Sequence, residues 1–210
     1  MPIWTDDDIR TPQGGEYLVD EQWYDANNCL IDVDETMRDM VCQSFEIPAG
    51  PAPQRDTDLL DFVKYKVPGW RRQHQRRGTC IGQGFKVGGD IVMAVNSIVA
   101  GHDWHGRAAV APIYAGSRVD VGNRPGTWDG SMGIWAVKWL RDYGVVTLQE
   151  LGLSDDSRAD DERIAVNWTK RSRGVPEEFE LLAAERPISA YVNIRSTRQA
   201  AHMLDAGHPV

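Results

Sequence analysis

A glycine-rich segment with a single cysteine, residues 78–85, constrains the fold of this chain more than any other stretch. It opens an apolar run that reaches about residue 100, in which hydrophobic side chains recur at the spacing of a helix buried on most sides. We therefore predict a long helix over residues 81–99, headed by Cys80. Its glycines lower the helix propensity, so they make sense where other backbone packs closely against the helix.

Cys80 has the position of an activated thiol in this prediction. The N-terminus of a helix carries unpaired N–H groups and a partial positive charge, which favours a thiolate over a thiol. A basic segment, residues 71–77, precedes the cysteine and acts in the same direction. Because the thiolate is the reactive form, Cys80 is a candidate nucleophile. The alternative is a buried structural cysteine.

The composition fits a globular protein without a membrane span or an export signal. Of the 210 residues, 41% are hydrophobic and 26% are charged, as in ordinary soluble domains. No apolar run is long and uncharged enough to cross a membrane, and the acidic N-terminus lacks the apolar core of a secretory signal. Three cysteines, Cys29, Cys42 and Cys80, without such a signal indicate a reducing compartment rather than a disulfide scaffold.

The net charge of −8 is distributed unevenly along the chain. Residues 1–66 hold fifteen acidic and five basic side chains, so residues 67–210 carry a small positive excess. We therefore predict an acidic N-terminal arm over 1–66 and a folded domain over 67–210. Trp4 and Trp23, in the polar arm, are candidate contacts with a protein partner. The basic segment 71–77 could bind phosphate or nucleic acid, but it could equally activate the thiol or pair with the arm, and nucleic-acid binding is not favoured.

Further elements are predicted from the spacing of apolar residues and from the glycines and prolines that end them. The chain contains no internal repeat. The acidic start and basic end of one candidate helix, residues 155–170, suit the helix dipole. The predicted helices and short apolar elements cover residues 32–45, 58–67, 111–119, 131–143, 155–170, 176–185 and 196–206, with an extended segment at 145–148 and an alternating, strand-like segment at 188–194.

Two further patterns have plain interpretations. Gly82, Gly84 and Gly88 are spaced like part of a dinucleotide-binding motif, but no apolar strand precedes them, so tight helix packing is favoured and no cofactor is expected. His102 and His105 could begin a metal site. A metal site needs at least a third ligand, which this segment does not offer, so a solvated loop is the favoured interpretation and no metal is expected.

Four segments, taken in order, share their pattern with one known family. The first is the Gly-Thr-Cys that ends at Cys80, at the start of a helix rich in small residues. The second, residues 111–119, is similar to a Ser-Pro-x-Tyr-x-x-x-Arg helix. The third joins the Asp-Gly-Ser at 129–131 to the Tyr-Gly-Val at 143–145, and the fourth, residues 196–210, is similar to a helix followed by a Gly-x-Pro-Val strand.

Together these segments resemble the papain-like cysteine peptidases over about residues 68–210. The variant looks most like proteins encoded by tailed bacteriophages and some bacteria. The resemblance implies an α+β fold, with a mainly helical subdomain organised around the helix that begins at Cys80 and the beginning of a β-rich second subdomain. No cofactor and no membrane are implied.

The resemblance also implies a reaction, the hydrolysis of a peptide bond in a peptide or protein substrate. In this family a cysteine thiolate attacks the carbonyl, a histidine carries the proton, and an Asn or Asp orients the histidine. Cys80 matches the nucleophile. The glutamine that holds the oxyanion lies six residues earlier in the family, where this chain has His74. Of the flanking glutamines, Gln75 is favoured for that role over Gln73.

The histidine and Asn of the family follow the Pro-Val strand, and none of this chain's histidines matches that position; they are His74, His102, His105, His202 and His208. We therefore expect either further polypeptide or a partner to complete the site, or a fold that has lost its activity. The first alternative is a cysteine peptidase carried in a phage virion or present in the bacterial host cytoplasm. The second is a catalytically inactive virion structural or assembly protein that docks on its neighbours through residues 1–66.

Overall fold

The structure is a computed structural model, and it describes a defined part of the chain. The described residues are 57–71, 75–126, 130–155, 157–170, 174–188 and 197–210, together with the single residues 191 and 194. Residues 1–56, which form most of the predicted arm, lie outside this part, as do the predicted helix at 32–45 and Gln73.

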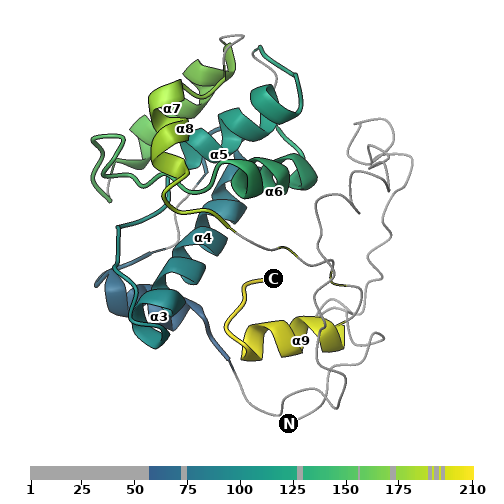
Figure 1. The fold of residues 1–210 in the computed structure, drawn as a ribbon. Helices are drawn as coiled ribbons and strands as arrows, with labels where there is room; N and C mark the ends of the chain where they lie inside the picture. The colour runs from purple at the N-terminus through teal and green to yellow at the C-terminus, as the bar shows by residue number, and fades with distance from the viewer. Residues whose placement is uncertain are drawn as a thin grey trace, which may run out of the picture.

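The described residues are mainly helical (Figure 1). The predicted helices within them are present, with shifts of a few residues at their ends. None of the described helices is long and apolar enough to cross a membrane. In chain order the elements are α3 (Leu60–Lys66), α4 (Cys80–Val99), α5 (Val110–Ala115), the π-helix η2 (Gly116–Val121), α6 (Gly133–Asp142), α7 (Arg158–Lys170), α8 (Glu177–Ala183) and α9 (Thr197–Asp205).

Within the described residues, extended pairing amounts to one isolated bridge. Ala108 and Thr147 form this antiparallel bridge, and the Ala109 N–H donates to the Val146 carbonyl at 2.9 Å beside it. The segment predicted to be extended at 145–148 therefore pairs with the residues that enter α5. The strand-like segment at 188–194 falls mostly outside the described residues, so the β-rich part of the predicted α+β fold is not confirmed.

The long predicted helix is present as α4, and Figure 1 shows it running between α3 at one end and the group of α5, α6, α7 and α8 at the other. The whole of α5 is buried. A Cβ on Gly82 of α4 would lie 2.9 Å from Val110 Cγ1 and 3.0 Å from Tyr114 Cβ, so only glycine permits this close approach of α5. The prediction of close packing at the α4 glycines is thus confirmed at Gly82 and wrong at Gly84, which faces open space.

The second half of α4 has a core of its own. Val63 of α3 is fully buried and clusters with Ile91 and Ala94 of α4. Residues 60–66, which the charge distribution placed in the acidic arm, therefore pack on the central helix. The chain after α9 also returns to α4, because a Cβ on Gly207 would lie 3.2 Å from Val95 Cγ1.

The π-helix η2 holds one carboxylate half-buried against the chain that enters α8. The Asp120 Oδ2 accepts a hydrogen bond from the Val175 N–H at 3.3 Å. Burial raises the pKa of Asp120 to about 6; the Val175 N–H opposes this rise, and the Glu180 carboxylate adds to it. Asp120 therefore holds its proton up to a higher pH in the folded protein than in the unfolded chain.

A pH dependence of stability follows from Asp120. Its folded pKa lies above the ordinary value, so the folded state retains a proton that the unfolded state releases, and stability falls as the pH rises from about 4 to about 6. We expect Asp120→Asn to raise the free energy of unfolding by about 1 kcal/mol at about pH 7.5, a figure reduced for solvent screening, and to have little effect at about pH 4. Urea denaturation at both pH values measures this, with the exposed Asp103→Asn as control. An equal gain at both pH values would contradict it.

Candidate active-site turn

Cys80 is the first residue of α4, as the sequence predicted, and its thiol is free and exposed. The chain bends into the helix at Thr79, which is buried and whose carbonyl accepts the first hydrogen bond, from the Gln83 N–H at 2.9 Å. The Thr79 side chain makes no capping bond to the helix. The thiol is therefore accessible to a reagent at the positive end of a 20-residue helix.

A buried carboxylate from α7 fixes this turn. Glu162 is 1% exposed, and both of its oxygens lie 3.3 Å from the Arg76 backbone nitrogen, which donates to them. Its Oε1 also accepts from the Thr79 hydroxyl at 3.2 Å and from the Gln83 amide at 3.0 Å. The donors come from both sides of Cys80, so Glu162 holds the turn before the cysteine to the first turn of α4.

The oxyanion glutamine proposed from the resemblance has a different contact here. The Gln75 side-chain amide donates a hydrogen bond to the Arg77 carbonyl within its own loop. Gln75 is exposed, and Gln73 lies outside the described residues. Gln75 is thus near Cys80 in the chain, but its amide is engaged with the backbone.

The second and third matching segments meet at the same turn. The Gly130 N–H lies 3.0 Å from the Gly78 carbonyl and 3.1 Å from the Tyr114 hydroxyl, and both accept from it. The Ser131 hydroxyl lies 2.7 Å from that of Ser117. Residues from the segments that begin at 78, 111 and 129 are therefore adjacent in space although they are far apart in the sequence.

The inner face of α4 carries two buried charges, Lys86 and Asp90. The Lys86 ammonium lies 3.7 Å from Asp161 Oδ2 of α7. The Asp90 carboxylate accepts from Arg107 Nε at 3.2 Å and from the Ala108 N–H at 2.7 Å. Burial raises the pKa of both Asp90 and Asp161, and their cationic partners oppose the rise.

Asp161 also positions the start of α5. Its two oxygens accept hydrogen bonds from the Val110 N–H at 2.8 Å and from the Ala111 N–H at 2.9 Å. These are two of the backbone donors that the first turn of a helix leaves unpaired. Asp161 and Glu162, consecutive residues of α7, thus hold α5 and the Cys80 turn in place.

Two of the described histidines, His102 and His105, follow the C-terminal end of α4. His102 follows the C-terminal end of the helix, and 20 residues of helix span about 30 Å. His105 is an exposed residue of the same loop. Next to His208, Pro209 lies beside Gly88, about 12 Å along the helix axis from Cys80.

The buried carboxylates Asp161 and Glu162 were not predicted from the sequence. Asp161 and Glu162 belong to an acidic run at the start of a charged helix, which is typical of a solvated helix end. The sequence did contain a signal in α4, the helix that faces these carboxylates. Lys86 and Asp90 interrupt its apolar run, and a charge on a buried face needs a partner.

Comparison with known proteins gives no match for this chain among protein-family models, curated proteins or solved structures. Among the described residues, no three His, Cys, Asp or Glu side chains gather as a metal site would require. The chemistry of the turn at Cys80 is therefore the basis on which a function is proposed below.

Proposed function

We propose that the chain is a papain-like cysteine peptidase domain in which Cys80 is the nucleophile. The observation that supports this most is the position of an exposed thiol at the N-terminus of α4, on a turn fixed by the buried Glu162. A helix N-terminus stabilises a thiolate, and a fixed turn keeps the sulfur in one orientation. The α+β fold with a β-rich second subdomain belongs to the same proposal.

The proposed reaction has two steps. The Cys80 sulfur attacks the peptide carbonyl, the C–N bond breaks, and the amine leaves with a proton, so that an acyl thioester remains. Water then attacks the thioester, and the carboxylate product and the free thiol are released. Both steps require a proton carrier, and His102 follows the end of α4 opposite to Cys80. We expect the base to be a histidine outside the described residues or a group of a partner chain.

The test is the reactivity of Cys80 relative to an ordinary thiol. We expect iodoacetamide at about pH 7 to alkylate Cys80 at least about tenfold faster than it alkylates glutathione, because the sulfur is exposed at the positive end of a 20-residue helix. Mass spectrometry of peptides locates the label, and Cys80→Ser separates it from labelling of Cys29 and Cys42. A rate equal to that of glutathione would contradict the proposal. Digestion of casein by the wild type, but not by Cys80→Ala, would identify the reaction as proteolysis.

A second candidate is a virion structural protein that has the same turn without the chemistry. It is favoured by the contact of Gln75, whose amide donates to the Arg77 carbonyl instead of being available to an oxyanion. In this case Glu162 has a purely structural role at the turn. Co-purification with a particle that is equally efficient for wild type and Cys80→Ala would support it, and casein digestion by the purified chain would contradict it.

A further inference from the structure

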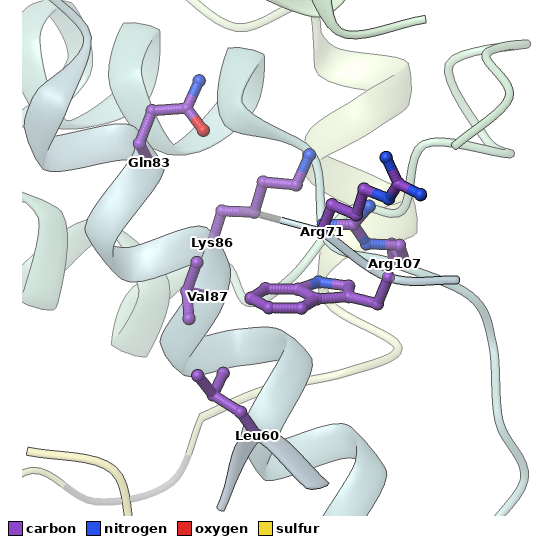
Figure 2. Close-up of a pocket in the computed structure, with 7 residues that line it drawn as sticks. Leu60, Arg71, Gln83, Lys86, Val87 and Arg107 are labelled. Carbon is purple, nitrogen blue, oxygen red and sulfur yellow. The ribbon is translucent and has the colours of Figure 1, made fainter. Parts of the chain in front are cut away.

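A cavity of about 280 Å³ lies beside α4, between α3 and the loop that precedes α5. Its apolar wall is formed by Leu60 of α3, Val87 of α4 and Trp70. The remaining lining residues are polar; they are Arg71, Gln83, Lys86 and Arg107. Figure 2 shows the charged ends of Arg71, Lys86 and Arg107 gathered on one side, with Val87 and Leu60 below them along the helices.

The lining residues include three cations and no acid. The side chains of Lys86 and Arg107 are only 1% and 5% exposed. Each pairs with a carboxylate that does not line the cavity, namely Asp161 for Lys86 and Asp90 for Arg107. No ion pair between described residues involves Arg71, so the third positive charge at the cavity is not balanced by these two acids.

Trp70, one of the residues that line the cavity, carries a buried hydrogen-bond donor. Among the described residues, no group accepts a hydrogen bond from the indole Nε1 of Trp70, although this atom is shielded from solvent. A buried donor without an acceptor costs about 1–3 kcal/mol. A small rotation of the indole toward the cavity would let a bound acceptor recover that cost.

We propose that this cavity binds a small organic carboxylate with a flat apolar body. The carboxylate supplies two acceptor oxygens, which match a guanidinium, an ammonium and an indole N–H. The apolar body of the ligand packs on the wall formed by Leu60, Trp70 and Val87. An inorganic anion has no apolar part to cover this wall. The volume lies just below the range of drug-sized pockets, which suits a ligand the size of an aromatic acid. This site does not depend on the reactivity of Cys80.

Benzoate is the probe, and benzamide, which has the same shape without the charge, is its control. The chain has eight tryptophans, so a nitrogen–proton correlation spectrum has up to eight indole signals, and the signal lost in Trp70→Phe identifies Trp70. We expect benzoate to shift this signal saturably and benzamide to bind at least about tenfold more weakly. Equal binding of the two compounds, or no shift with benzoate, would overturn the proposal.

Two arginine variants test where the charge is recognised. Arg71→Gln removes the exposed cation of the cavity and is expected to weaken benzoate binding about tenfold. Arg77→Gln removes an exposed cation that does not line the cavity, and it is expected to leave binding unchanged. Equal weakening by both variants would show general charge attraction and would overturn the site. Lys86 is kept, because its replacement would leave Asp161 buried without its partner.

The carboxylate can come from a free acid or from a polypeptide, and a competition experiment separates these sources. A blocked peptide with a central glutamate, added to the benzoate complex, displaces benzoate if the cavity accepts a side chain. If it does not displace benzoate, the ligand is a free acid. Carboxylate recognition is supported in both cases. If the matching glutamine peptide, which has no side-chain charge, also displaces benzoate, the proposal of carboxylate recognition is overturned.

Discussion

Replacement of Asp161 by alanine is expected to lower the free energy of unfolding by about 4 kcal/mol. The Asp161 carboxylate is fully buried and accepts the N–H groups of Val110 and Ala111 while it faces the Lys86 ammonium. Alanine would leave these two backbone donors without their acceptor and a buried cation without this carboxylate. Each loss is costly because water does not reach the site to replace the missing partner.

Equilibrium urea denaturation measures this effect. A loss of this size is a large part of the total stability of a domain, so the alanine variant can fail to fold. Asp161→Asn keeps one acceptor oxygen, and we expect it to cost about 2 kcal/mol. Asp160→Asn is the matched control: Asp160 precedes Asp161 but is exposed and pairs with Arg163 on the surface, so less than about 0.5 kcal/mol is expected. Equal effects of the two asparagine variants would show that Asp161 has no special role.

The second large effect is expected at Glu162. Glu162→Gln keeps the size of the side chain but replaces one acceptor oxygen with an NH₂ group, which cannot accept from Arg76 or Thr79. We expect a loss of about 2 kcal/mol in the free energy of unfolding. We also expect the Arg76 amide proton to exchange about tenfold faster, because the turn before Cys80 loses its anchor.

Hydrogen exchange distinguishes this local effect from a general loss of stability. Amides in the middle of α6, which lie outside the turn, report the global change. If Glu162 anchors the turn, Glu162→Gln accelerates the exchange of the Arg76 amide more than that of the α6 amides, under conditions where the protein stays folded. Glu178→Gln on the exposed face of α8 is the charge-matched control and is expected to change neither quantity. Uniform acceleration over the whole chain would contradict the anchoring role.

The local elements followed from the sequence because their signals are local. Apolar spacing is a property of neighbouring residues, so the helix headed by Cys80 could be predicted within one residue of its observed start. The helix glycines were informative at Gly82, where α5 comes close, but not at Gly84, which faces open space. The predicted strand at 188–194 falls mostly outside the described residues and stays a prediction.

Only one part of the candidate site, Cys80, could be predicted from the sequence. Cys80 has a recognisable context, with Gly-Thr before it and a helix after it. Its anchor could not be identified, because Glu162 is 82 positions away and belongs to an acidic run that also fits a solvated helix end. The cavity beside α4 was equally hidden, since Leu60, Trp70 and Arg107 come from three separate segments.

The sequence by itself determined where the helices lie and that a cysteine begins the central one, because both depend on residues within a few turns of each other. Only the tertiary structure decided which charges are buried. Asp160 and Asp161 are consecutive and chemically identical, yet one is exposed and the other is enclosed between α4, α5 and α7. The role of a carboxylate depends on the donors and the solvent around it, and these are supplied by segments that only folding brings together.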